Sequence, residues 1–286
     1  MLLHVMSKRG FQITGTNRTK KPESTPANIA WQVLDAERCS VEEIANILQG
    51  AEWAINAIGV IKPHIRDNDP IQVERSIRVN TLFPYMLSRA AEETNTKILQ
   101  IATDCVYSGK KGHYLETDDH DPLDVYGKTK SLGEVPSSSF HNLRCSIVGP
   151  EPQRRLSLLD WFLSQGQNAE INGFTNNKWN GITTLHFAKL CAGIIERDLT
   201  LRNLHHIVPN GTVTKYELLK IFARYFGRGD LRITPKEATE AIDRTLDTLD
   251  HSFNLTLWQT AGYSHPPTIS EMVSELASSS GHSVRV

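Results

Sequence analysis

Apolar and polar positions along the first half of the chain follow two alternating patterns. Short apolar runs bounded by polar or glycine positions are typical of buried strands. Stretches with apolar residues three and four positions apart are typical of helices that cover a sheet. The expected strands are residues 11–16, 31–34, 53–58, 97–102 and 142–148, and the expected helices are residues 2–8, 41–48, 71–93 and 125–134. This alternation predicts an α/β fold with a doubly wound parallel sheet.

The alternation stops after Pro150. Helical patterns follow over residues 156–165, 185–196 and 215–226, with one short apolar strand at 205–208. We therefore expect a sheet domain at residues 1–150 and a smaller mixed domain at residues 151–286. Individual segments of the second region can still return to the sheet.

The chain opens on a helical pattern at Leu2 and reaches its first strand only at Phe11. A helix followed by a strand is the second half of a βαβ unit, so the Rossmann-type sheet is expected to lack its first strand. The turn after that strand lets the pyrophosphate of a dinucleotide approach a helix N-terminus, and the sequence contains neither GxxGxxG nor GxGxxG. A misplaced start or a truncation is the favoured explanation. The alternative is a protein that lacks the turn and has lost cofactor binding.

Composition narrows the class of protein. The chain has 286 residues, 39% of them hydrophobic, and a formal net charge of −1, so it offers no basic field for nucleic acid. No window approaches the roughly 18 apolar residues of a membrane span, and the opening stretch does not resemble a secretory signal. The four cysteines lack the spacing of a zinc site. We expect a cytoplasmic protein with free thiols and no bound metal.

The pattern Tyr-x-x-x-Lys places a phenol and an ammonium on one face of a helix. A nearby ammonium favours the phenolate and lowers the tyrosine pKa, so the phenol can act as a general acid or base. The pattern occurs at Tyr107, Tyr126 and Tyr216, each followed four residues later by lysine. The first lies in a predicted loop and the third on an amphipathic helix that needs no function. Only Tyr126 and Lys130 have a hydroxyl partner in the right place, Thr103 at the carboxyl end of a strand.

The segment IATDCVYSGKKGHYLETDDHDPLDVYGKTKSLGE, residues 101–134, resembles the active-site segment of the extended short-chain dehydrogenases/reductases. More narrowly, it is similar to the dTDP-4-dehydrorhamnose reductase family. The positions in register are Thr103, Asp104, Val106, Gly109, Tyr114, Glu116, Asp118, Pro122, Tyr126, Gly127, Lys130, Gly133 and Glu134. A weaker resemblance covers nearly the whole chain and includes Asn80, Gly149-Pro150 and residues 181–184. The sequence departs from the family at Cys105, where a tyrosine is usual, and at Thr183, where proline is frequent.

The resemblance implies a catalytic role for three residues. Tyr126 would donate the proton, Lys130 would lower its pKa and hold the nicotinamide ribose, and Thr103 would orient the keto oxygen. The hydride would come from the nicotinamide. Asp104 and Cys105 would face the sugar.

Cofactor choice depends on the end of the strand at residues 11–16. Asn17 and Arg18 follow this strand without a carboxylate, which favours NADP(H) over NAD(H) because arginine accommodates a 2′-phosphate. A solvated arginine in a basic loop is the alternative. The other expected cofactor contacts are Asp35 near the adenine, Ala57, Ile58 and Gly59 near the pyrophosphate and ribose, and Asn80.

Further substrate contacts are expected in the second region. Trp179 could stack on a base and Asn180 could bond a sugar hydroxyl, although a tryptophan that covers a domain seam fits equally well. Arg244 resembles an arginine near the family's C-terminal substrate loop, with a surface ion pair as the alternative. Arg154 and Arg155 could pair with a diphosphate, but a solvated helix start is favoured.

These observations favour an NAD(P)H-dependent reductase of a nucleotide-activated 4-keto sugar, which serves surface polysaccharide assembly. A sugar-nucleotide epimerase or dehydratase that retains NAD is one alternative. A non-catalytic binding subunit of the same fold is the other, and the absent glycine turn favours it. The expected partner is a nucleotide sugar, without nucleic acid or membrane, and a homodimer is the assembly considered.

Overall fold

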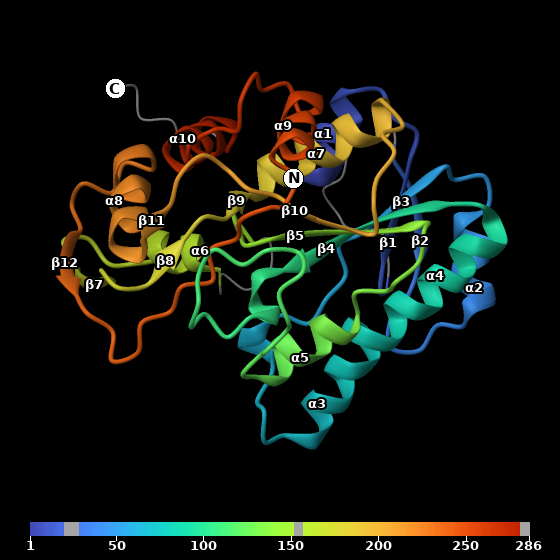
Figure 1. The fold of residues 1–286 in the computed structure, drawn as a ribbon, viewed down its shortest axis with the longest axis horizontal. Helices are drawn as coiled ribbons and strands as arrows, with labels where there is room; N and C mark the ends of the chain where they lie inside the picture. Colours follow the sequence, from blue (N-terminus) through green and yellow to red (C-terminus); the bar gives the residue numbers. More distant parts are fainter. Residues whose placement is uncertain (20–28, 152–156, 281–286) are drawn as a thin grey trace. The chain divides into compact units, whose positions relative to one another are not determined.

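A computed structural model describes residues 1–19, 29–151 and 157–280 (Figure 1). The chain divides into two compact units. Unit 1 contains residues 1–107, 119–144 and 191–205. Unit 2 contains residues 108–118, 145–190 and 206–286. The division therefore differs from a single boundary at residue 150, because one early segment packs with unit 2 and one late segment packs with unit 1.

Unit 1 is built on a four-stranded parallel sheet with the order β10-β5-β4-β3. The strands are β3 (Trp53–Asn56), β4 (Lys97–Thr103), β5 (Phe140–Cys145) and β10 (Leu204–His206). Trp53 pairs with Lys97 and Asn56 with Gln100, which fixes the β3–β4 register. The α/β class with a parallel sheet is thus confirmed.

The first two strands form a separate parallel pair. β1 (Ile13–Asn17) and β2 (Ile29–Val33) run side by side, with Ile13 opposite Ile29. Within the described ranges no strand is hydrogen-bonded to both β1 and β3. The described strands of unit 1 therefore lie in two sheets, the pair β1-β2 and the four-stranded sheet.

The helices of unit 1 include one whose start is set by a capping interaction. They are α1 (Leu2–Lys8), α2 (Val41–Leu48), α3 (Pro70–Ile77), α4 (Phe83–Thr94) and α5 (Val125–Leu132), with 3-10 turns η1 (Lys62–His64) and η3 (Asp104–Val106). Ser40 and Glu43 form a capping box at α2, as the serine there predicts. α3 and α4 are joined through a π-helical turn, η2 (Arg78–Leu82), so the predicted long helix is locally widened. Such turns are frequent at functional sites.

α2 and α4 cover one face of the strands with a closely packed apolar cluster. Phe83, Ile98 and Phe140 are almost fully buried in it. Ala90 and Ala91 have no exposed surface, and such small side chains let the helix approach the sheet closely. This packing gives the carboxyl ends of β3 and β4 a rigid support.

Unit 2 is mixed and contains only short strand pairs. These are β6 (Ile147–Val148) with β9 (Ile182–Thr183), β7 (Glu170–Phe174) with β12 (Arg232–Lys236), and β8 (Lys178–Trp179) with β11 (Val213–Thr214). Its helices are α6 (Leu158–Leu163), α8 (Lys215–Tyr225), α9 (His251–Thr260) and α10 (Ile269–Ser279). α7 (Thr184–Glu196) begins in unit 2 and ends in unit 1.

Candidate active site

Thr103 ends β4 and begins η3, so a catalytic hydroxyl is placed by the strand and oriented by the turn. Its side chain accepts a hydrogen bond from the Cys105 backbone N–H at 3.1 Å and donates to Asp104 Oδ1 at 3.2 Å. Thr103 and Asp104 are both buried. The hydroxyl therefore has a fixed direction at the carboxyl end of a parallel strand, where α/β sheets place their ligands.

Two glycines set the position of α5 beside this turn. A Cβ added to Gly127 would lie 2.3 Å from the Cys105 carbonyl oxygen, and one added to Gly133 would lie 1.9 Å from the Asn80 carbonyl oxygen. Any other residue would therefore push the helix away from η3 or from η2. Asp124 caps the helix by accepting from the Gly127 N–H at 2.8 Å. The two glycines thus bring Tyr126 to Thr103.

Tyr126 is half-buried, and its hydroxyl is hydrogen-bonded to Thr103. Burial raises its pKa well above the ordinary value of 10, and the nearby Cys105, Asp104 and Asp124 raise it further, whereas the bond to Thr103 lowers it. Lys130 is 8% exposed, and its Nζ donates to the Ile101 carbonyl oxygen at 2.8 Å. Burial and the acidic neighbours thus outweigh the lowering of the Tyr126 pKa, and the role expected of Lys130 stays a prediction. The site holds a protonated phenol, which is a proton donor.

Asn80 lies in the π-helical turn and is 1% exposed. Its Oδ1 accepts from the Val60 N–H at 2.8 Å, and its Nδ2 donates to the Val60 carbonyl at 3.0 Å and to Thr129 Oγ1 at 3.2 Å. The side chain was expected to contact the cofactor. In the structure it joins the loop after β3 to α5, and its contact with the cofactor stays a prediction.

The loop after β3 is held from its other side by a row of buried amides. Asn56 Oδ1 accepts from the Ile58 N–H at 3.1 Å, and Asn56 Nδ2 donates to Gln100 Oε1 at 2.8 Å. Gln100 Nε2 donates to Asn142 Oδ1 at 3.1 Å and to the Gly133 carbonyl at 2.7 Å. Three neighbouring strands therefore tie the loop containing Ala57, Ile58 and Gly59 to the end of α5. The sequence analysis did not identify this row, because single Asn and Gln residues within apolar strands form no recognisable sequence motif.

A second group of charged side chains lies at the ends of β1 and β2. Arg18 follows Asn17, whose Oδ1 accepts from the Arg18 N–H at 2.8 Å. Arg18 Nη1 lies 3.5 Å from Glu37 Oε1, and Arg75 Nε of α3 lies 2.6 Å from the same oxygen. The Glu37 N–H in turn donates to Asp35 Oδ1 at 3.0 Å. A carboxylate therefore does reach Arg18, although none lies on its own strand.

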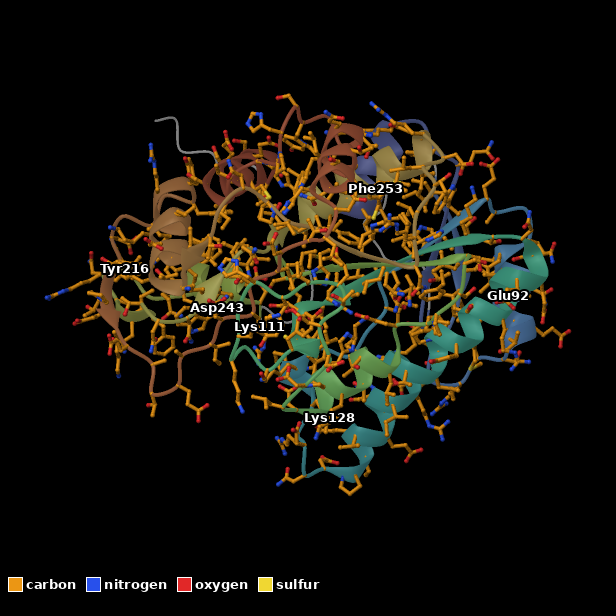
Figure 2. The ribbon with its side chains drawn as sticks, viewed as in Figure 1. Glu92, Lys111, Lys128, Tyr216, Asp243 and Phe253 are labelled. Atoms are coloured by element: carbon orange, nitrogen blue, oxygen red, sulfur yellow. The ribbon has the colours of Figure 1, made fainter. Side chains whose placement is uncertain are left out.

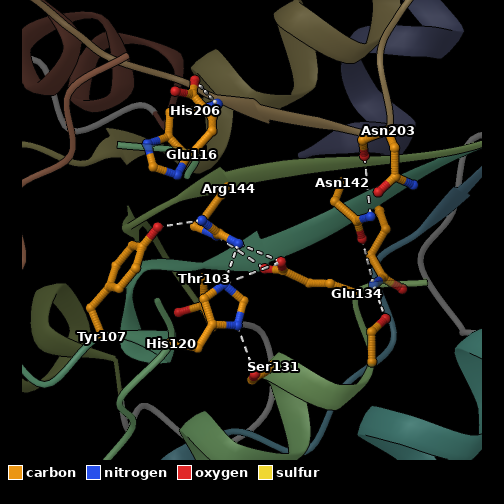
Figure 3. Close-up of polar contacts among 12 residues, drawn as sticks. Thr103, Tyr107, Glu116, His120, Ser131, Glu134, Asn142, Arg144, Asn203 and His206 are labelled. Carbon is orange, nitrogen blue, oxygen red and sulfur yellow. Dashed lines mark hydrogen bonds and ion pairs between the residues drawn. The ribbon is translucent and has the colours of Figure 1, made fainter. Parts of the chain in front are cut away.

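A buried ionic cluster lies behind the catalytic helix (Figure 3). Arg144 of β5 has no exposed surface, and it is paired with both carboxylate oxygens of Glu134. Its Nη1 donates to the Tyr107 hydroxyl at 2.5 Å, and its Nη2 donates to His120 Nε2 at 2.7 Å. Because arginine can only donate, His120 Nε2 must be the acceptor and its Nδ1–H must point at Ser131 Oγ, 2.7 Å away.

The pKa of His120 is lowered by burial and by Arg144, while Glu134 opposes the shift. The imidazole is therefore held neutral and bridges Arg144 to Ser131, the neighbour of Lys130. The cluster supports the C-terminal end of α5. Sequence reasoning did not identify Arg144, because an arginine within an apolar strand is not recognisable as buried.

In unit 2, the expected substrate residues are engaged by the protein itself. Trp179 is buried, and its Nε1 donates to Ser146 Oγ at 2.8 Å. Asn180 bonds the backbone of Leu246 twice, at 2.7 Å and 2.9 Å. Arg244, half-buried, belongs to a segment that pairs with the loop 108–118 through the Asp243 N–H and the Gly109 carbonyl, 2.8 Å apart (Figure 2). Trp179 and Asn180 thus have partners within unit 2, and their substrate contacts stay predictions. Arg154 and Arg155 lie outside the described residues.

Glu116 holds the loop of residues 108–118 in unit 2 by hydrogen bonds. It accepts from Thr248 Oγ1 at 2.7 Å and from the Leu249 N–H at 3.0 Å. Burial alone would raise its pKa, but these hydrogen bonds and the nearby His206 lower it overall. The acidic residue carried over by the resemblance is thus a structural tie within unit 2.

The residues of unit 1 fit a nicotinamide dinucleotide at two places. Arg18 and Arg75 offer guanidinium groups beyond β1, and Tyr126 and Lys130 lie beside the end of β4. The sequence supplies no glycine-rich turn for the pyrophosphate between them. In the described ranges, no group of three or more His, Cys, Asp or Glu side chains could hold a metal ion.

Two curated relatives share part of the sequence. A dTDP-4-dehydrorhamnose reductase from Aggregatibacter actinomycetemcomitans is 42% identical over 69 residues, 24% of each chain. The methionine adenosyltransferase 2 subunit beta of Danio rerio is 26% identical over 159 residues, 51% of this chain and 48% of that protein. The chain thus spans about a quarter and about half of the lengths of these relatives.

Solved structures share the fold over nearly the whole chain. A dTDP-4-dehydrorhamnose reductase from Clostridium acetobutylicum superposes with a TM-score of 0.72 at 18% identity, covering 95% of this chain and 100% of that chain. The enzyme of that name from Bacillus anthracis, in complex with NADP, gives 0.69 at 16% identity over 88% and 90%. MoeE5 in complex with UDP-glucuronic acid and NAD gives 0.71 at 16% identity over 98% and 95%.

A family-wide comparison extends the likeness beyond these partial matches. The family described as RmlD substrate binding domain matches residues 2–280, which include the catalytic turn, α5 and all of the helices and strands described above. The chain therefore belongs to the RmlD substrate binding domain family.

Proposed function

We propose that this protein is an NAD(P)H-dependent reductase that converts the 4-keto group of a nucleotide-activated sugar to an alcohol. The observation that carries the proposal is the Thr103–Tyr126 pair, in which a half-buried phenol is hydrogen-bonded to the hydroxyl at the end of β4. Membership of the RmlD family and the curated dTDP-4-dehydrorhamnose reductase relative support the substrate class.

The chain's own residues supply the proton and the orientation. When bound, the nicotinamide supplies the hydride. With substrate bound, the Thr103 hydroxyl would turn its proton from Asp104 Oδ1 to the keto oxygen, and Tyr126 would transfer its phenolic proton to that oxygen as negative charge develops. Lys130, fixed at the Ile101 carbonyl, keeps a positive charge one helical turn from the phenol and can bond the ribose. Asp104 and Cys105 lie in the turn that follows Thr103, on the sugar side of the proposed site.

NADP(H) is the proposed cofactor because Arg18 follows β1, the strand position that approaches the adenosine ribose. Asn17 and Asp35 complete this edge, and Ala57, Ile58 and Gly59 border the middle of the cofactor. The NADP and NAD complexes among the solved structures support a nicotinamide cofactor of either kind.

The test is Tyr126→Phe, with Tyr216→Phe as the matched control from the other Tyr-x-x-x-Lys helix. Titration calorimetry measures NADPH binding, and absorbance at 340 nm measures turnover of dTDP-4-dehydrorhamnose. Tyr126→Phe should bind NADPH normally and lose about 100-fold or more in kcat, because it removes a general acid. The control should behave as the parent. Equal turnover of Tyr126→Phe and the parent would refute the assignment.

Two alternatives remain separable by the same assay. An epimerase or dehydratase would convert substrate without net consumption of NADPH. A non-catalytic binding subunit would bind neither dinucleotide and turn over no sugar. The relative named as a methionine adenosyltransferase subunit favours the second.

Setting and assembly belong to the same proposal. We place the reaction in the cytoplasm, in the synthesis of surface polysaccharide. Along the part of the chain that is described, no helix has both the length and the apolar character needed to cross a bilayer. Leu82, Tyr85 and Leu132 are 49%, 42% and 62% exposed on η2, α4 and α5 of unit 1, which supports a homodimer through these helices. Light scattering of Leu132→Glu, expected to be monomeric, tests it.

A further inference from the structure

Glu37 is shared by two arginines from different parts of unit 1. Its Oε1 lies 2.6 Å from Arg75 Nε and 3.5 Å from Arg18 Nη1. The side chains of Glu37 and Arg75 are 27% and 41% exposed, so solvent and solutes reach the pair. One carboxylate thus compensates part of the charge of two guanidinium groups.

The position of Glu37 follows from the strand pairing. β1 and β2 are parallel and paired from Ile13 with Ile29 to Asn17 with Val33, so their carboxyl ends meet at the same edge. Arg18 follows β1 directly, and Glu37 follows β2 after a short turn in which its N–H donates to Asp35 Oδ1 at 3.0 Å. Arg75 reaches the same place from α3. The turn at Asp35 therefore directs the carboxylate toward Arg18.

We propose that Glu37 is the residue that sets the choice between a dinucleotide with a 2′-phosphate and one with a free 2′-hydroxyl. A phosphate needs guanidinium donors, and the carboxylate already accepts from Arg75 Nε and pairs with Arg18 Nη1. A ribose hydroxyl needs an acceptor, and the carboxylate is one. Glu37 thus limits the preference for NADP(H) that the two arginines would otherwise give. The inference rests on the proposed function and assigns the selectivity of that same site.

The variant Glu37→Gln removes the charge while keeping the shape of the side chain. The matched control is Glu74→Gln. Glu74 lies on the same helix as Arg75, and its carboxylate forms an exposed pair with Arg78. Calorimetric titrations use four probes: adenosine 2′,5′-bisphosphate, adenosine 5′-monophosphate, NADPH and NADH. Thermal unfolding confirms that both variants are folded.

Glu37→Gln should raise the affinity for the two probes with a 2′-phosphate about tenfold relative to the two probes without one. The substitution removes a charge of the same sign as the phosphate and frees two guanidinium groups. Glu74→Gln should leave the ratio of the two affinities within about twofold of the parent, since the Glu74 charge is exposed and screened. A ratio unchanged in Glu37→Gln, or moved equally by both variants, overturns the inference while the parent still binds dinucleotide. A parent that binds none of the four probes overturns the proposed function as well.

Discussion

Glu134→Gln should destabilise the protein far more than the loss of an ordinary acidic side chain. Arg144 has no exposed surface, and Glu134 is 8% exposed, so the guanidinium keeps its charge in an environment that water does not reach. The glutamine retains the shape and one acceptor but removes the negative charge paired with the arginine, while the bonds to the Tyr107 hydroxyl and His120 Nε2 remain. Breaking a buried pair from one side costs about 3–5 kcal/mol of unfolding free energy. That is a large part of a typical stability of about 5–15 kcal/mol.

Urea unfolding followed by circular dichroism measures the effect, with Glu196→Gln as the control. Glu196 is paired with Arg9 at 2.8 Å, but the two side chains are 40% and 27% exposed, so this loss should cost about 1 kcal/mol or less. The double variant Glu134→Gln/Arg144→Met should cost well under the sum of its two single variants, because it leaves no unpaired buried charge. A Glu134→Gln cost equal to that of the control would refute the account of the cluster.

Three further predictions concern buried groups in both units. Burial lowers the pKa of His186 from 6.5 to about 4, opposed by Glu275 and aided by Lys189, so the unfolded chain binds its proton first. Stability should therefore be complete above pH 6.5 and fall by about 3 kcal/mol toward pH 4, and urea unfolding of His186→Phe should lack this loss. Gly133→Ala should lower kcat and reduce the free energy of unfolding by about 1–3 kcal/mol, because the added Cβ would meet a backbone oxygen. A Cβ at Gly229 would have nothing within 4 Å, so Gly229→Ala should change neither kcat nor stability in the same kinetic and thermal assays. Gln100→Leu should cost about 2–3 kcal/mol in urea, because it leaves buried amide groups without partners; a cost below about 0.5 kcal/mol would contradict the amide row.

Local features of the fold were predictable because they depend on neighbours in sequence. Ser40 and Glu43 are three residues apart, and the capping box they form begins α2 where expected. Thr103 was correctly placed at the end of β4, because an apolar run that stops at a polar residue marks a strand end. The separate β1–β2 ladder could not be predicted, because strand order depends on pairing between distant segments.

The candidate site shows the same division between local and distant information. The 34-residue segment 101–134 points to Thr103, Tyr126 and Lys130 through their spacing, the strand end at Thr103 and the family resemblance, and the structure places the first two in contact. The sequence could not show that the Asn80 amide is fully used by Val60 and Thr129, which come from 20 and 49 residues away. Nor could it show that Glu37 reaches Arg18. These contacts exist only once the sheet edge and the π-helical turn have formed.

The surroundings of Tyr126 keep its phenol protonated. Lys130 was expected to stabilise a phenolate, but its ammonium is held by the Ile101 carbonyl, while burial, Cys105 and two aspartates favour the neutral phenol. A reduction consumes a proton at the oxygen that receives it, so the acid must be protonated before the hydride arrives. An oxidation needs the opposite, a phenolate ready to take the alcohol proton. The proposed reduction would therefore start from the protonated phenol that the surroundings of Tyr126 favour.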